Sequence, residues 1–406
     1  MIIIFEPQCI GFEHAEFNSA FIKVVKKAFN DEILFIAEKE HIKNVKNLLS
    51  DVQISHMEVE VPPKEDADWE RSRREFRLTG KVFELAASRN CRDLIFSSLT
   101  SPTLIAAKFL LRRYKDIRVL TVPHIVLDSI TSVPHSRNVI FWLRIWLKLF
   151  NTPRLRYLLL GKTIQNELLR ELPELEPYTA YIDHPYIFKG HEETGDHAQN
   201  GEPKVLENKE PENYSSKLST AKEDKITFGF LGVGYRKKGI EDFIKLSNDV
   251  KSSLKAQKKD VSFVVVGHVP EGEITIKPEE NSLLVASKTP LKQEDYDDYM
   301  EKIDYAMFLH KPTAYRFAAS GVFFDAVSYL KPIIAIKNPL FQYYFDLMGD
   351  IGYLCRDYGE VKDLVLNLIE KQDKERYNRQ KLNLKKGQEK MSLDRIAEKL
   401  RGVWSD

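Results

Sequence analysis

The sequence predicts an α/β protein built from two doubly wound parallel-sheet domains in tandem. Short apolar runs of the kind that form buried strands alternate with stretches whose apolar residues recur at helical spacing, which is typical of a parallel sheet covered by helices. This pattern occurs twice, on either side of a polar stretch from Lys189 to Asp224. The chain has 406 residues, of which 43% are apolar, so each of two domains can bury its own core.

The first half supplies one series of elements. It opens with an apolar strand, and the following helix has apolar residues at positions 17, 20, 21, 24, 25 and 28. Spacings of three and four residues place these side chains on one helix face. The predicted elements, in order, are a strand at Ile2–Phe5, that helix, a strand at Ile33–Ala37, a helix at Trp69–Ala87, a strand at Asp93–Ser97, a helix at Thr103–Tyr114, strands at Arg118–Val122 and Tyr157–Gly161, a helix at Thr163–Leu172 and a short apolar run at Tyr181–Phe188.

The second half begins after a stretch with almost nothing to bury. Residues 189–224 are rich in Glu, Lys, Asn, Gly and Ser, so we predict a linker or mobile excursion there. We therefore expect one domain at 1–188, a second at 225–385 and a C-terminal segment at 386–406. The predicted elements are strand Lys225–Gly232, helix Ile240–Leu254, strands Val261–Gly267, Ser282–Ser287 and Tyr305–Leu309, helix Gly321–Tyr329, a buried strand that ends at Ile336 and a terminal amphipathic helix at Met391–Trp404.

The composition excludes several classes of protein. With 61 basic and 60 acidic residues, the chain has no overall positive field to attract nucleic acid. Its three cysteines are odd in number and far apart, which disfavours a disulfide framework or a clustered metal site. The first residues lack the basic and apolar regions of a signal peptide, and no apolar run reaches the roughly 20 residues of a membrane span. We expect a cytoplasmic protein that requires neither cofactor nor metal.

The most informative stretch runs from Asp304 to Ile336. In it, Ser320 and Gly321 open a short helix between a polar loop and a buried strand. The free N–H groups and the positive dipole end of that helix are a natural seat for a phosphate. Asp325 follows one helical turn later, so its carboxylate lies on the same side and can accept hydrogen bonds from sugar hydroxyls.

A second candidate site is the loop from Gly232 to Gly239. Gly232 and Gly234 permit close approach of a ligand, and Arg236 and Lys238 bring positive charge. The spacing fits neither the dinucleotide fingerprint nor the P-loop, so we predict a diphosphate cradle, with a solvated basic turn as the alternative. Three further residues on the same side are predicted to contact the ligand. They are Gly267, Lys311 and Arg316, the last two as cations for a phosphate.

The loop after the first strand carries titratable groups. Gly11 begins the turn, and Glu13, His14 and Glu16 follow it. Any one of these three side chains can act as a general base on a hydroxyl group. Helix capping or simple surface exposure is the alternative for each.

Taken in order, these motifs resemble the GT-B glycosyltransferases, which have two Rossmann-like domains around an interdomain cleft and take sugars from nucleotide-diphosphate donors. The matching residues are Asp304, Ser320-Gly321, Asp325, Lys331-Pro332 and Lys238-Gly239. Two positions depart from the family pattern. Phe317 stands where the family has its first acidic residue, and Val233 stands where it has an arginine, for which Arg236 is expected to substitute.

The resemblance also assigns expected roles in the first half. Val122-Pro123-His124 is similar to the Val-x-His segment of these enzymes, so His124 is expected to reach the donor sugar near the reaction centre. Asp128 is a second candidate base beside Glu13, and Gly11 and His14 are expected on the acceptor side. The terminal segment 386–406 is expected to pack back on the first domain.

The expected function is transfer of a sugar, by a hexosyltransferase-like and metal-independent enzyme, to a glycan, glycolipid or polyprenyl-linked acceptor in cell-surface polysaccharide synthesis. A nucleotide-sugar epimerase of the same architecture and a non-catalytic GT-B-like binding protein are the alternatives. Val139–Phe150 is aromatic over most of its helical surface, with Arg144 and Lys148 as a narrow cationic stripe. Such a helix can lie at the inner face of a membrane, although a buried helix or a dimer face fits equally well.

Overall fold

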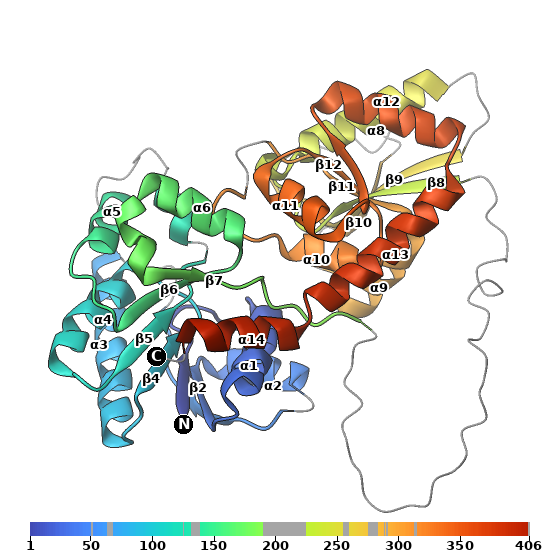
Figure 1. Cartoon of the computed structure of the whole chain (residues 1–406). Coiled ribbons are helices and arrows are strands. Elements are labelled where there is room, and N and C mark those ends of the chain that lie inside the picture. Colours follow the sequence, from blue (N-terminus) through green and yellow to red (C-terminus); the bar gives the residue numbers. More distant parts are fainter. Residues whose placement is uncertain are drawn as a thin grey trace, which may run out of the picture.

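The computed structural model describes residues 1–49, 52–62, 68–124, 126–130, 139–189, 225–254, 260–274, 283–287, 289, 291–311 and 315–404. Within these ranges the chain forms two parallel sheets flanked by helices (Figure 1). The predicted α/β class with two doubly wound sheets is confirmed. The linker predicted at 189–224 falls, apart from Lys189, outside the described residues.

The first sheet has seven strands in the order β3-β2-β1-β4-β5-β6-β7, and every neighbouring pair is parallel. Its central strands are continuous apolar runs because helices cover both faces. The strands are β1 (Ile2–Phe5), β2 (Ile33–Ala37), β3 (Ser55–Glu58), β4 (Asp93–Phe96), β5 (Arg118–Thr121), β6 (Leu155–Leu159) and β7 (Thr179–Tyr181). The helices are α1 (Ala15–Phe29), α2 (Lys39–Leu48), α3 (Asp68–Ser88), α4 (Ser101–Arg113), η1 (Val126–Ile130), α5 (Val139–Lys148), α6 (Lys162–Glu171) and η2 (Pro173–Tyr178).

The second sheet has six strands in the order β10-β9-β8-β11-β12-β13, also all parallel. Separate apolar cores cover its two faces. The strands are β8 (Lys225–Leu231), β9 (Asp260–His268), β10 (Leu283–Ser287), β11 (Tyr305–Phe308), β12 (Ile333–Ile336) and β13 (Gly352–Cys355). The helices are η3 (Arg236–Lys238), α8 (Ile240–Leu254), α9 (Gln293–Lys302), α10 (Gly321–Ser328), α11 (Pro339–Met348), α12 (Tyr358–Glu370), α13 (Lys374–Lys390) and α14 (Leu393–Trp404).

Both sheets reverse their strand order beside their first strand. β1 lies between β2 and β4, and β8 lies between β9 and β11. At such a switch point the loops leave adjacent strands toward opposite faces and open a crevice at the carboxyl ends of the strands, where ligands bind in open α/β sheets. The loops that follow β1 and β8 are therefore the places to look for a site.

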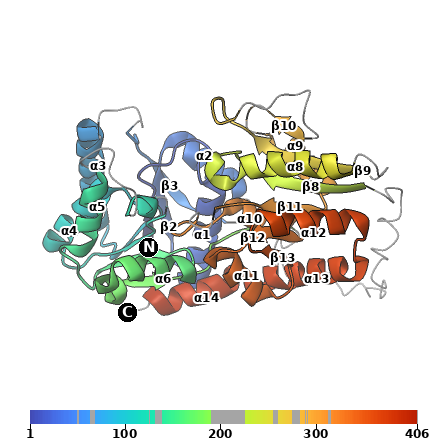
Figure 2. The same cartoon turned by 90° about the horizontal axis from the view of Figure 1, so that it is seen from above.

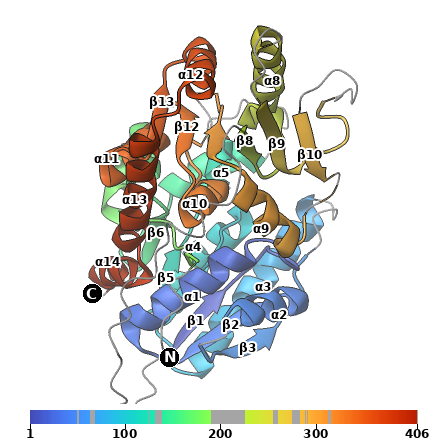
Figure 3. The same ribbon diagram turned by 90° about the vertical axis from the view of Figure 1, so that its right-hand side faces the viewer.

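The last two helices connect the halves. α13 packs against α10 and α11, whereas α14 lies along α1 of the first half (Figures 1 and 2). Ile396, Leu400 and Trp404 of α14 are buried in the first core, and Arg401 donates hydrogen bonds to the carbonyls of Lys27 and Ala28 at 3.1 and 2.7 Å. Figure 3 shows α14, in red, low in the view beside the blue α1, with α12 and α8 of the second half at the top.

Some elements differ from those predicted. α2, β3, α9, α11, β13, α12 and most of α13 were not expected. β7 includes only the first residue of the apolar run predicted at 181–188, and residues 182–189, here called the crossing segment, pass from the first sheet to the second half without regular structure. No helix in the described part of the chain is long and apolar enough to cross a lipid bilayer.

Candidate functional site

A cavity of about 190 Å³ lies where the two switch points meet. Its walls come from the start of α1, the loop after β5, the crossing segment and the start of α10, so both halves of the molecule contribute. The lining residues are His14, Glu16, Phe17, Leu160, Ala318, Ala319, Gly321, His124, His184, Pro185 and Tyr186. The structure thus brings His14 and His124 of the predicted first-half site opposite Gly321 of the predicted donor side.

Three histidines form the first-half side of this cavity. The ring centroids of His14 and His124 are 4.8 Å apart, and Phe17 lies against both His124 and His184 at 4.8 and 5.3 Å. Burial lowers the pKa of His124 well below its ordinary value and that of His184 to about 4, so both rings are neutral near pH 7. Within the described chain, His124 Nε2 and His184 Nδ1 have no hydrogen-bond partner. Two buried ring nitrogens are thus available to a ligand.

His14 is held in an unusual backbone conformation. Its φ angle is 52°, in the left-handed region that non-glycine residues seldom adopt, and it immediately precedes α1. Such strain is retained only where the surrounding structure enforces it, and it concentrates at functional sites. Glu13, the neighbouring residue, is exposed and does not line the cavity. Asp128 lies in η1, but its side chain falls outside the described part of the structure.

The second-half wall combines a helix N-terminus with a buried cation. Ser320 precedes α10, and its hydroxyl is buried with no hydrogen-bond partner in the described chain. A Cβ placed on Gly232 would lie 2.8 Å from Val322 of α10 and 3.9 Å from Lys238 Nζ, so the Gly232 loop meets the first turn of that helix. Burial lowers the pKa of Lys238 to about 8. The Ser320 hydroxyl, the free N–H groups at the start of α10 and the ammonium group of Lys238 therefore lie together. An anion-binding site needs such hydrogen-bond donors and positive charge.

His310, just after β11, belongs to the same wall and lies close enough to Lys238 to be affected by its charge. Its ring is buried between Tyr315 and Phe341, and Nδ1 has no partner among the described residues. Burial and the charge of Lys238 lower the pKa of His310 to about 3, so it is neutral and can hydrogen-bond through that nitrogen. Lys311 is exposed at the end of β11, beside residues 312–314, which are not described.

Asp325 lies beneath this wall and is bound by tyrosines. Its two carboxylate oxygens accept hydrogen bonds from the hydroxyls of Tyr186 at 2.7 Å and Tyr296 at 2.8 Å. Desolvation raises its pKa, while the tyrosines oppose that shift. Asp325 on α10 therefore joins the crossing segment to α9 through these two tyrosines, and its predicted contact with sugar hydroxyls stays a prediction.

Two cations that the sequence predicts at the ligand have protein partners in this structure. Arg316 forms ion pairs with Glu167 at 2.7 Å and Glu171 at 3.4 Å, both on α6 of the first half, so it joins the two halves, and its contact with a phosphate stays a prediction. Arg236 pairs with Glu241 at 3.3 Å and donates to the carbonyl of Glu273 at 2.8 Å. These competing acidic and carbonyl groups could not be identified from the loop sequences.

Three of the glycines predicted at the site occupy their positions for different structural reasons. Gly267 faces the backbone of Gly232 so closely that a Cβ would collide with the carbonyl, which shows that the loops after β8 and β9 touch. Gly234 packs against Val269. Gly11 has a φ angle of 54°, and its N–H donates to the Glu38 carboxylate at 3.1 Å.

Sequence reasoning missed a buried carboxylate that supports the first-half loops. Glu6, at the end of β1, is fully buried and accepts hydrogen bonds from both sides of the switch point. The donors are the backbone N–H groups of Gln8 and Cys9, the Asn18 amide and the Ser97 and Ser98 hydroxyls. His184 and Tyr186 were also missed, because the run at 181–188 was noted only for its apolar residues. The polar residues within it, including a His-Pro pair, are the signal that could have identified a crossing segment.

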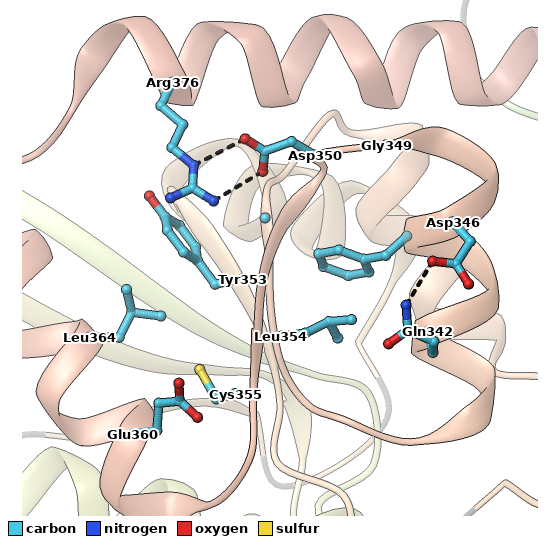
Figure 4. Close-up of a pocket in the computed structure, with 12 residues that line it drawn as sticks. Gln342, Asp346, Gly349, Asp350, Tyr353, Leu354, Cys355, Glu360, Leu364 and Arg376 are labelled. Carbon is cyan, nitrogen blue, oxygen red and sulfur yellow. Dashed lines mark hydrogen bonds and ion pairs between the residues drawn. The ribbon is translucent and has the colours of Figure 1, made fainter.

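A larger cavity of about 590 Å³ lies beside edge strand β13 (Figure 4). Its charged groups already have protein partners, since Arg376 donates to Asp350 at 3.0 and 3.3 Å, Gln342 donates to Asp346 at 2.7 Å and Arg356 pairs with Glu360 at 3.1 Å. This cavity is away from both switch points. In the described residues, no group of histidine, cysteine or acidic side chains is arranged to hold a metal ion. The smaller cavity between the halves is therefore the candidate site.

Comparison with solved structures identifies the fold as GT-B. The chain superimposes on HepE of Anabaena in complex with UDP with a TM-score of 0.64, at 14% identity over 100% of both chains. Sucrose-phosphate synthase from Thermosynechococcus elongatus gives 0.60 at 11% identity, over 100% of this chain and 98% of that one. UDP-GlcNAc 2-epimerase from Neisseria meningitidis gives 0.50 at 12% identity, over 98% and 99%. No protein-family model and no curated protein matches the sequence.

Proposed function

We propose that this GT-B protein is a glycosyltransferase that moves a hexose from a nucleotide-diphosphate donor to a hydroxyl group of a glycan, glycolipid or polyprenyl-linked acceptor. One observation carries the proposal: the buried hydroxyl of Ser320, which has no hydrogen-bond partner among the described residues, the start of α10 and Lys238 lie together next to a cavity that His124 lines from the other half. The similar HepE structures hold UDP, UDP with glucose, and UDP-glucose, which supports a nucleotide-sugar donor.

In this function the donor diphosphate lies against α10, with Gly232 allowing close approach. Negative charge that develops on the leaving diphosphate is stabilised by Lys238 and by the fixed N–H groups of α10, a form of catalysis that needs no reorganisation during the reaction. His124 faces the donor sugar. Because an ammonium group and a helix end provide the positive charge, transfer is expected to continue in the presence of EDTA.

The first experiment measures nucleotide binding. Thermal unfolding of the protein is followed with UDP, GDP and their glucose, N-acetylglucosamine and mannose derivatives at saturating concentration. A ligand present at 100 times its Kd stabilises the folded state by about 2.7 kcal/mol, so selective stabilisation identifies the donor. If no nucleotide raises the midpoint and no sugar is transferred, the proposed function is wrong and a non-catalytic role is favoured.

The epimerase is the second candidate, and the similar fold of UDP-GlcNAc 2-epimerase favours it. The two activities differ in what they need. An epimerase converts the donor without any acceptor and releases no nucleotide, whereas a transferase releases nucleoside diphosphate in proportion to sugar transferred. NMR of the sugar and quantification of released UDP therefore separate them.

Gly321→Ala provides a sensitive test of the donor site. Nothing lies within 4 Å of a Cβ at Gly321, and alanine favours helix, so the fold is expected to tolerate the change. A phosphate close to the backbone would meet the added methyl group, and we expect nucleotide affinity to fall about tenfold, which corresponds to roughly 1.4 kcal/mol. Isothermal titration gives the Kd. Gly402→Ala, at an equally open position on α14, is the control and should bind normally; equal affinities for both variants would contradict the placement of the phosphate.

A lipid-linked acceptor would place the protein at the cytoplasmic face of a membrane, with roles in polysaccharide synthesis. An aromatic patch formed by α4, the described part of α5 and Phe150 after it supports such contact. Phe109 and Phe150 are 40% and 43% exposed, Trp146 packs against both, and Arg112 lies over Phe150. The predicted cationic stripe contributes less, because Arg144 and Lys148 form ion pairs with acidic residues of the first half.

Phe109→Asp is expected to weaken membrane binding by roughly 10- to 100-fold, since burying one phenylalanine side chain is worth roughly 1.5–3 kcal/mol. Co-sedimentation with vesicles of phosphatidylethanolamine and phosphatidylglycerol measures it. Leu382→Asp, at a 51% exposed position on α13, is the matched control. If Phe109→Asp and Leu382→Asp sediment alike, the aromatic patch does not contact lipid.

A further inference from the structure

The cavity contains one carboxylate whose position and chemistry suit proton transfer. Glu16, in the first turn of α1, lines the cavity beside His14 and remains accessible to solvent. It lies close enough to the second half to interact electrostatically with Asp325 and Tyr186. The cavity that Glu16 lines is bounded by the histidine cluster and by Gly321 at the start of α10.

Glu16 differs from the other titratable groups of the cavity. His124 and His184 are neutral near pH 7 but are weak bases, since burial lowers their pKa values. Desolvation and the nearby Asp325 carboxylate raise the pKa of Glu16 to about 6, so it is ionised at pH 7 yet a stronger base than an ordinary glutamate. The titratable groups around it are His14, His124, His184 and Tyr186 along the cavity and Asp325 on α10, and Asp325 in turn interacts with the charge of Lys238.

We propose that Glu16 is the catalytic base of the transfer reaction. Its carboxylate accepts the proton of the acceptor hydroxyl while that oxygen forms a bond to C1 of the donor sugar. The bond between C1 and the diphosphate oxygen breaks at the same time, and its electron pair leaves with the diphosphate. This assignment rests on the proposed function, and it is preferred to Glu13 because Glu16 lines the cavity and Glu13 does not.

The location of Glu16 also explains why the site lies between the domains. Glu16 belongs to the first half, whereas Lys238 and Ser320, the groups for the leaving diphosphate, belong to the second. The Arg316 ion pairs with Glu167 and Glu171 join α6 to the segment before α10, and this contact holds the two halves at the separation seen here. The base and the leaving-group site are thus brought together only by the interdomain arrangement.

The test uses Glu16→Gln, which keeps the size of the side chain and removes its ability to accept a proton. With the donor found by thermal unfolding, and both water and octyl glucoside as acceptors, we expect kcat to fall by roughly 10²–10⁴-fold, the usual contribution of a general base. The Kd for UDP should stay within about twofold, because Glu16 is not in the phosphate wall. Glu40→Gln on the exposed face of α2 is the matched control, with wild-type kcat expected.

The pH profile separates a catalytic from a structural role. In the wild type, kcat/KM should fall below about pH 6, where Glu16 becomes protonated and can no longer accept a proton. Glu16→Gln should lose this acidic limb, and formate should restore part of the activity of Glu16→Ala. If the wild type is active and Glu16→Gln keeps either the wild-type rate or the acidic limb, Glu16 is not the base. The same follows if Glu13→Gln loses activity and Glu16→Gln does not. These outcomes overturn the assignment of Glu16 and leave the proposed function standing. A wild type that neither binds nor turns over any nucleotide sugar overturns the proposed function as well.

Discussion

Glu6→Ala is expected to cost about 4 kcal/mol of the free energy of unfolding of the first half, a magnitude typical of removing a buried, multiply hydrogen-bonded charge. Glu6 is fully buried. Alanine would leave the Asn18 amide, two serine hydroxyls and two backbone N–H groups without their acceptor in a dry interior. The loop from residue 8 to His14 would lose its anchor, so Glu16 and His14 would also be displaced.

Urea unfolding followed by tryptophan fluorescence measures this effect. The four tryptophans are at positions 69, 142, 146 and 404, and α14 packs on the first half, so their fluorescence reports that half. Glu6→Gln, which keeps one acceptor oxygen, should lose less of the free energy of unfolding than Glu6→Ala. Glu32→Ala, at an exposed position, should stay within about 0.5 kcal/mol of wild type. Equal midpoints for Glu6→Ala and Glu32→Ala would show that the network contributes little.

The fold could be predicted because its strands are local apolar runs. Ile2–Phe5 and Tyr305–Phe308 are entirely buried, and their sequence pattern alone indicates parallel strands covered on both faces. β3 was missed because it is an edge strand of mostly exposed residues, Ser55–Glu58, which lacks that pattern. α13 was missed for a similar reason, since its 17 residues are strongly charged and its buried face is narrow.

The site could be predicted only where backbone geometry determines it. Ser320-Gly321 and Lys238 lie next to strand ends, so the topology alone brings them to one edge. Charged side chains were less predictable, because their partners are distant in sequence. Arg316 pairs with Glu167, 149 residues away, and Phe317, at the position where the family resemblance expects an acid, is buried in the core of the first half. Phe317, where the family resemblance expects an acidic residue, therefore forms a packing contact between the two halves.

Gly267→Ala is expected to lower the free energy of unfolding by about 3–5 kcal/mol, as backbone strain and overpacking add at one position. Its φ angle is 150°, which L side chains rarely adopt, and a Cβ would lie well inside 3.0 Å of the Gly232 carbonyl. Both groups are backbone, so neither can rotate away. The carboxyl ends of β8 and β9 would have to separate, although the Gly232 N–H now donates to Val266 at 2.8 Å.

The same separation would move Gly232 away from Lys238 and α10, so nucleotide binding should be lost together with stability. Gly272→Ala distinguishes collision from strain, because Gly272 has a φ angle of 83° but no atom within 4 Å of its Cβ position. Gly272→Ala should lower the free energy of unfolding by only about 1 kcal/mol and leave nucleotide binding intact. Far-UV circular dichroism in urea and UDP titration measure both effects. If the two variants behaved alike, contact between the loops after β8 and β9 would not be what shapes the phosphate site.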